Sequence, residues 1–170
     1  MTQDDEFEAY VARAWPSLVR SAVLLGCELH EAEDLAQTTL IRCYRSWRKV
    51  GSAANPDAYV YRMLVNCHHD SHRRHWWGEQ PTPAIPDRPD RDRTSEVDDA
   101  DAVSRALQWL DRGQREVVVL RFYAQLSEQE TADALAIPVG TVKSRLSRAL
   151  SRLSKDTNLN DITGGPDRGR

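Results

Sequence analysis

Basic and hydroxyl side chains near the end of the sequence have the clearest chemical potential in the chain. Between residues 139 and 153, apolar residues recur at helical spacing, and hydrogen-bond donors occupy the positions between them. Such donors suit phosphate oxygens and the edges of base pairs. The residues expected to contact DNA are Thr141, Lys143, Ser144, Arg145, Ser147 and Arg148.

The segment before this helix has the spacing of a helix-turn-helix. Ser127 and Glu130 form a predicted capping box that starts a first helix, and a short turn at residues 136–138 leads into the second. This motif leaves the polar side of the second helix free to enter the major groove. Small or apolar residues are expected to pack between the two helices: Ala132, Leu135, Ile137 and Val142.

Residues 126–150 resemble the second domain of bacterial extracytoplasmic-function (ECF) sigma factors, in particular the actinobacterial SigE-like group. The resemblance rests on Leu126-Ser127, on Glu130, and on the run Pro-Val-Gly-Thr-Val-Lys-Ser-Arg at residues 138–145. It implies that the helix-turn-helix reads the minus-35 promoter element. The sequence departs from the family at Ala136, where glycine is usual. If that turn needs a positive φ, the alanine costs about 1 kcal/mol.

A second segment, residues 31–47, resembles the helix by which sigma factors bind the polymerase clamp. Asp34, Gln37 and Ile41 fall on a side of this predicted helix away from its apolar stripe, so they are available to a partner. An ordinary solvated helix face is the alternative. The resemblance implies three partners: core RNA polymerase, through its clamp and flap; promoter DNA; and an anti-sigma factor, which the family often has but which no residue here identifies.

A third segment, residues 59–66, resembles the helix with which the family engages the melted minus-10 strand. The resemblance assigns Asn66 and the loop around Val50 to a flipped base. Arginines that neutralise phosphates and tryptophans that stack on bases suit single-stranded DNA, although the tryptophans could equally pack against protein. The residues expected to contact the minus-10 element are Val50, Arg62, Asn66, Arg73, Arg74, Trp76 and Trp77.

Cysteine and histidine cluster in the same predicted helix, at Cys67, His68, His69, His72 and His75. His68 and His72 lie four residues apart on one helical face and could share a metal ion. No second ligand pair has zinc-site spacing, so we expect no metal, no cofactor and reduced cysteines. Two rival functions stay open: a metal-binding sensor, and a stand-alone helix-turn-helix regulator that binds operator DNA as a dimer.

Taken together, the segments predict an all-α protein of two small helical domains. Residues 1–77 would form sigma region 2, which binds core polymerase and the minus-10 element, with a helix break near Trp15 because proline follows it. Residues 78–101 read as a flexible acidic linker, residues 102–154 as sigma region 4, and residues 155–170 as a disordered tail.

The composition favours a cytoplasmic, non-catalytic protein. The net charge is −3, the apolar runs are too short to cross a bilayer, and the start of the chain lacks a signal sequence. No catalytic residues are expected, because in the implied role the polymerase performs phosphoryl transfer and this subunit supplies position.

Overall fold

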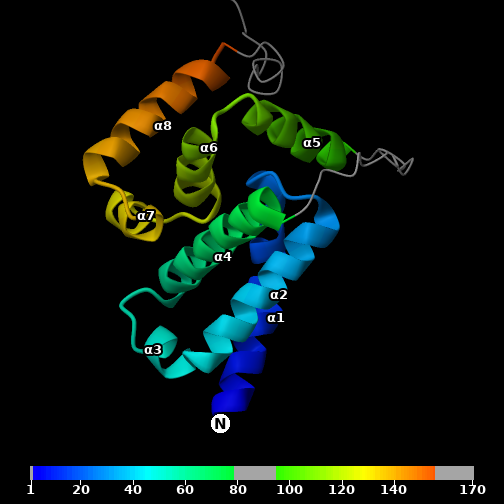
Figure 1. Cartoon of the computed structure of the whole chain (residues 1–170), viewed down its shortest axis with the longest axis vertical. Helices are drawn as coiled ribbons and strands as arrows, with labels where there is room; N and C mark the ends of the chain where they lie inside the picture. Colours follow the sequence, from blue (N-terminus) through cyan, green and yellow to red (C-terminus); the bar gives the residue numbers. More distant parts are fainter. Residues whose placement is uncertain (1, 79–94, 156–170) are drawn as a thin grey trace, which may run out of the picture.

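A computed structural model describes residues 2–78 and 95–155, which form helices joined by short loops, with no strand among them. The first domain (residues 2–78) consists of α1 (Gln3–Leu24), α2 (Leu29–Arg45), α3 (Trp47–Gly51) and α4 (Pro56–Gly78). The second domain (residues 95–155) consists of α5 (Ser95–Gln108), α6 (Arg112–Val118), the π-helical turn η1 (Val119–Tyr123), α7 (Glu128–Leu135) and α8 (Val139–Leu153). Figure 1 shows the two groups of helices one above the other, which confirms the predicted all-α class.

α1 runs through Pro16 without a break, so the predicted interruption near Trp15 is wrong. A proline inside a helix costs roughly 3 kcal/mol. Here Ala14 and Leu18, on either side of the proline, are buried on one stripe, and Pro16 itself is exposed. Packing of that stripe against the rest of the first domain therefore outweighs the local preference.

α4 begins with a capped N-terminus. The side-chain Oδ1 of Asn55 accepts a hydrogen bond from the backbone N–H of Ala58 at 3.2 Å, which is N-cap geometry. The helix then continues through the histidines and ends at Gly78. Val60, Leu64 and other residues of its inner side are buried, and α4 packs against α2.

α5 begins at Ser95, earlier than the predicted start of the second domain at Ala102. This helix includes residues 95–101, which the sequence assigns to the acidic linker. The remainder of that linker, residues 79–94, and the tail from residue 156 lie outside the described residues.

The turn of the helix-turn-helix has the expected geometry. Ser127 and Glu130 form the predicted capping box, with Ser127 Oγ accepting from the Glu130 N–H at 3.1 Å and Glu130 Oε2 accepting from the Ser127 N–H at 2.8 Å. Ala136 ends α7 in the left-handed region, at φ 52°. The cost predicted for a non-glycine residue at this position therefore applies.

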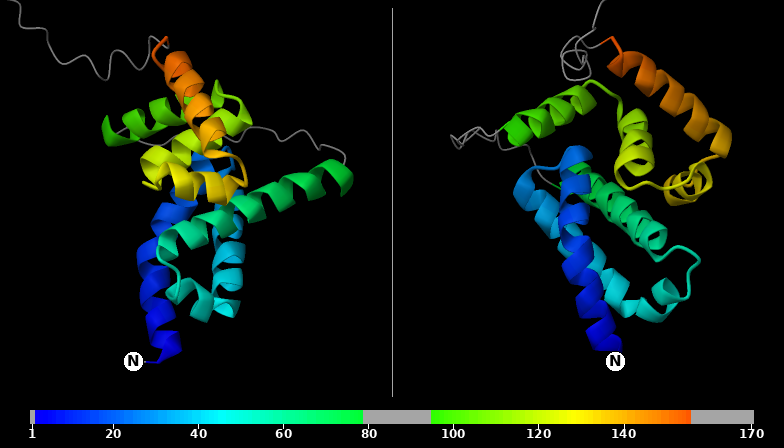
Figure 2. Two further views of the ribbon diagram at one scale, coloured as in Figure 1. Left: turned by 90° about the vertical axis from the view of Figure 1, so that its left-hand side faces the viewer. Right: turned by 180° about the vertical axis from the view of Figure 1, so that it is seen from behind.

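The two domains share buried apolar residues. Leu64 of α4 belongs to the same buried cluster as Val117 and Leu120 of the second domain. A second cluster joins Leu24, at the end of α1, to Leu107 of α5. Both views in Figure 2 show the second domain seated against the first, and α4 lies in contact with α7. Among the described helices, none combines the length and apolarity that crossing a membrane requires.

Candidate functional site

α8 turns a polar side away from the core. Val142 and Ala149 are completely buried, whereas Lys143, Ser147 and Arg148 are exposed. Lys143 Nζ lies 3.6 Å from Glu128 Oε2 of α7, so its charge is held beside the first helix of the motif. Two further predicted DNA contacts, Thr141 and Ser144, are half-buried, and Ser144 Oγ donates to the Thr141 carbonyl at 3.1 Å.

Arg145 differs from the other residues predicted to contact DNA. It is half-buried, and its guanidinium lies over Gly113 in the first turn of α6. A Cβ atom at Gly113 would approach Arg145 Nη1 to 2.8 Å, so only glycine leaves room for this arrangement. The structure thus gives Arg145 a packing position inside the second domain.

The residues predicted to contact the minus-10 element are exposed, with one exception. Arg62, Asn66, Arg73 and Arg74 are exposed, and Trp76 and Trp77 are 89% and 86% exposed. These two indole rings are therefore not core residues. Val50 is the exception, because it lies in α3 and is completely buried among apolar side chains. The side chain of Val50 does not reach the surface, and a direct contact between it and DNA is not supported.

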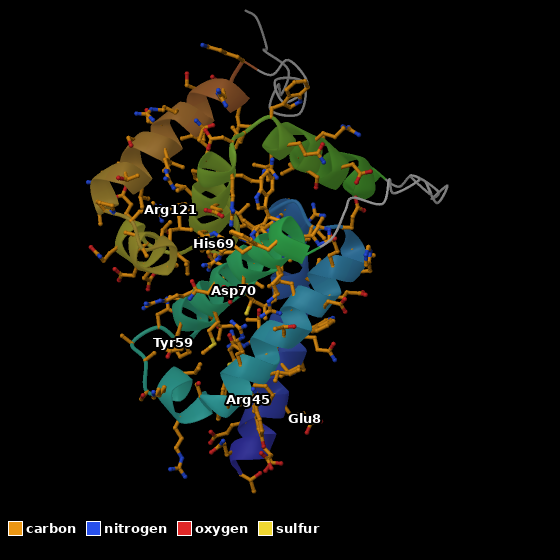
Figure 3. All side chains as sticks on the ribbon, viewed as in Figure 1. Glu8, Arg45, Tyr59, His69, Asp70 and Arg121 are labelled. Carbon is orange, nitrogen blue, oxygen red and sulfur yellow. The ribbon has the colours of Figure 1, made fainter. Side chains whose placement is uncertain are left out.

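Two polar contacts hold α4 against the second domain. Asn55 Nδ2 donates to Glu130 Oε1 at 2.8 Å, and His69 Nε2 lies 2.7 Å from Glu116 Oε1. Arg62 lies seven residues from each of Asn55 and His69, which is about two helical turns. It therefore shares their side of α4. In Figure 3, His69 lies where α4 meets the second domain.

Histidines and charged groups gather at this boundary. His68 is 1% exposed, and its Nε2 lies 3.1 Å from His72 Nε2, while its Nδ1 has no hydrogen-bond partner. Burial, with the neighbouring charges of His72 and Arg112, lowers the pKa of His68 to about 4, so this imidazole is neutral at pH 7. Burial acts to raise the pKa of Glu116, but His69 and Arg112 outweigh it and hold that pKa below its usual value.

The residues predicted to bind polymerase are exposed on α2, but they face two different depressions. Gln37 and Ile41 line an apolar groove of about 400 Å³ between α1 and α2, together with Phe7 and Trp15. Asp34 faces a depression of about 290 Å³ between α2 and the later part of α4. Ile41 is 50% exposed, an unusual position for an apolar side chain without a partner.

The cysteines form no disulfide. Cys43 and Cys67 are buried and Cys27 is half-buried. Burial raises the pKa of Cys27 and Cys43 to about 11, so these thiols stay protonated at neutral pH.

Sequence reasoning missed Arg115, which connects the ends of two helices. Its guanidinium donates to the carbonyls of Leu107 at 3.0 Å, Leu25 at 3.3 Å, Leu110 at 3.3 Å and Gln108 at 3.4 Å. The carbonyls at the end of a helix lack partners within it, and a cation there is favourable. No pattern in the sequence marks one arginine of a helix as the one that turns inward.

Both domains match known families. Residues 6–78 match sigma-70 region 2, and residues 100–153 match sigma-70 region 4. The RNA polymerase sigma-E factor of Streptomyces coelicolor is 39% identical over 162 residues, which cover 92% of this chain and 89% of that protein. The chain belongs to the ECF sigma factors of the sigma-70 family. The ECF RNA polymerase sigma factor SigM of Mycobacterium tuberculosis is 33% identical over 150 residues, covering 88% of this chain and 76% of that protein.

Solved structures of other proteins share the fold of this chain. The sigma factor RpoE from Bartonella quintana, in complex with the anti-sigma factor NepR, has a TM-score of 0.70 at 25% identity, covering 88% of this chain and 95% of that chain. CnrH, in complex with the cytosolic domain of CnrY, has a TM-score of 0.64 at 25% identity, covering 95% and 91%. As a sigma factor, this protein directs promoter-specific initiation by RNA polymerase.

Proposed function

We propose that this sigma factor reads promoters with two separate surfaces and binds core polymerase with a third. α8 would read the minus-35 duplex, and α4 would read the melted minus-10 strand. The proposal rests above all on the polar side of α8, where Lys143, Ser147 and Arg148 are exposed while Val142 and Ala149 are buried. A helix so oriented can enter the major groove without unfolding its own domain.

The groove between α1 and α2 is the surface we assign to the polymerase clamp. Gln37 and Ile41 lie on its rim, and Asp34 lies one turn earlier on α2. An apolar groove flanked by polar residues is typical of a protein-binding site. By the family resemblance, the second domain would meet the polymerase flap.

The minus-10 surface requires a rearrangement before it can work. Asn55 and His69 bond to the second domain on the side of α4 that also carries Arg62. A DNA strand laid along that side would meet α6 and α7. We therefore propose that the domains separate when the sigma factor binds polymerase, which frees the face of α4.

We assign no reaction to this chain. In the proposed role it supplies binding energy and position, and the polymerase carries out phosphoryl transfer. It would act in the cytoplasm, where transcription takes place.

An anti-sigma factor is a further proposed partner. RpoE of Bartonella quintana was solved in complex with an anti-sigma factor. In this chain an apolar depression of about 270 Å³, lined by Phe122, Val103 and Leu153 among others, lies open on the second domain. Phe122 is 58% exposed, which suits burial by a partner.

Run-off transcription with core polymerase across a promoter library tests the proposal. Wild-type protein should produce selective transcripts, and both Asp34→Ala/Gln37→Ala and Lys143→Ala/Arg148→Ala should abolish them. Arg105→Ala is the control, since it removes an exposed positive charge of the second domain that lies on α5 and not on α8. Tight duplex binding without stimulation of polymerase would instead indicate a stand-alone regulator.

A further inference from the structure

We propose that this sigma factor binds a first-row divalent metal ion, with Zn²⁺ as the reference case, at His68, His69 and Glu116. One ligand atom from each residue lies within 4.8 Å of the others. His68 and His69 come from α4 of the first domain, whereas Glu116 comes from α6 of the second. A bound ion would therefore join the two domains.

The spacing of these atoms is close to that of a metal site. Zinc bonds of about 2.0–2.2 Å in a tetrahedral arrangement separate neighbouring ligand atoms by roughly 3.4 Å. The pair His69 Nε2 and Glu116 Oε1 is 2.7 Å apart. A shift of under about 1 Å, with the shared proton released, would admit an ion between them.

His68 supplies an independent observation. Its side chain is 1% exposed, yet its Nδ1 has no hydrogen-bond partner. Buried polar atoms are rarely left without a partner, because the lost hydration is not compensated. The neutral imidazole has the protonation state that a metal ligand needs. Its other nitrogen contacts His72 Nε2 at 3.1 Å, an arrangement that would orient the ring as outer residues do in metal sites.

The donor set points to a particular class of ion. Two imidazoles and a carboxylate bind zinc and its first-row neighbours, whereas Ca²⁺ and Mg²⁺ prefer oxygen ligands alone. Three protein ligands leave a fourth position for water. Cys67, which the sequence placed beside these histidines, is buried and does not belong to the group.

Arg112 would disfavour binding of the metal ion. Its Nε donates to Glu116 Oε1 at 3.0 Å, so a positive charge already neutralises the carboxylate. The side chain is half-exposed and can turn toward solvent. Arg112 and the metal ion would therefore compete for Glu116, and removal of the arginine should strengthen metal binding.

Because the ligands come from both domains, metal binding would favour the docked arrangement over the separated one. Any resulting decrease in transcription rests on the proposed function, since it requires that α4 be freed to read DNA. Metal binding itself does not rest on it.

Titration of the full-length, chelator-treated protein with Zn²⁺ against a chromophoric chelator tests the site. We expect one ion per chain in this cluster. His69→Ala and Glu116→Gln should each weaken binding at least about tenfold, and Arg112→Ala should tighten it. His30→Ala is the matched control, because His30 is an exposed histidine on α2, and its removal should leave the affinity unchanged.

Hydrogen exchange of the same proteins provides the second measurement. Zn²⁺ should slow exchange in α4 and α7 of the wild type but not of Glu116→Gln. Absence of Zn²⁺ binding, or equal binding by wild type, His69→Ala and Glu116→Gln, would overturn the proposal. His69 is only half-buried, so His69→Ala keeps the test valid if Glu116→Gln proves unstable. Transcription in zinc-free buffer is a separate readout, and its failure would count against the proposed function alone.

Discussion

The two helices proposed to read DNA are in different states in this structure. α8 presents Lys143, Ser147 and Arg148 to solvent, with its apolar side buried inside its own domain. On α4, the side that carries Arg62 is flanked by two contacts with the other domain. One DNA-reading surface is therefore ready, and the other depends on the arrangement of the domains.

The difference has a simple physical origin. On α8, packing and DNA reading use opposite sides of the helix, so they do not compete. On α4, docking uses Asn55 and His69, and the proposed DNA contacts Arg62 and Asn66 lie on the same side. In the proposed function, domain docking and minus-10 recognition would therefore compete, and polymerase would shift the equilibrium by binding the separated form.

Locking the domains together should have the largest effect. In Asn55→Cys/Glu130→Cys, a short bis-maleimide with a cleavable disulfide would join positions whose native side chains are 2.8 Å apart. The cross-linked protein should lose transcription by on the order of 100-fold, because little of the competent state remains. Its affinity for minus-35 duplex should change little, because α8 is free.

Reduction of the linker is the internal control, and it should restore transcription. The native thiols should not interfere, since Cys43 and Cys67 are buried and the half-buried Cys27 has its pKa raised to about 11. Full transcription by the cross-linked protein would mean that docking and minus-10 reading are compatible.

The contrast predicts different behaviour of two arginines in the free protein. Arg148→Ala should weaken binding to minus-35 duplex by about 1–3 kcal/mol if it contacts a base, or reduce the salt dependence if it contacts a phosphate. Arg62→Ala should leave that affinity unchanged and should impair open-complex formation only when polymerase is present. Fluorescence anisotropy across salt concentrations and permanganate footprinting measure the two effects. Equal losses of duplex affinity would remove the distinction between the surfaces.

Arg115 tests how firmly the domains are held. Its guanidinium donates hydrogen bonds to backbone carbonyls of both domains. Arg115→Ala should therefore lower the free energy of unfolding by roughly 1.5 kcal/mol. This value is the lower end of the range for charged hydrogen bonds, because the guanidinium is partly exposed. The substitution should also increase hydrogen exchange at the end of α1. Urea denaturation measures the first effect, with Arg105→Ala on exposed α5 surface as control. A change in stability without faster exchange there would place the role of Arg115 within the second domain.

Elements with strong local signals were predictable from the sequence. The capping box at Ser127 and Glu130 and the short turn at residues 136–138 were correct, because short-range hydrogen bonds and local chain geometry determine them. The continuity of α1 through Pro16 was not predictable, since tertiary packing of Ala14 and Leu18 decides it.

The candidate site was harder to predict from the sequence than the fold was. The position of Glu116 beside His69 joins residues 47 apart in the chain, and helical periodicity carries no information on such a pair. The burial of Val50 and the inward turn of Arg145 likewise depend on α3 packing and on Gly113. Periodicity predicts which side of a helix is polar, but not which polar residues a neighbouring domain engages.

The smallest expected effect concerns the turn that orients α8. Ala136 has φ 52°, where a Cβ is unfavourable, so Ala136→Gly should stabilise the protein by about 1 kcal/mol and raise Tm by roughly 2–4 °C. Ala12→Gly, at an exposed position inside α1, should have the opposite sign. Calorimetry measures both. DNA affinity should stay constant in Ala136→Gly, since the backbone conformation is unchanged; weaker binding would mean that the strained alanine holds α8 at the angle that the duplex requires.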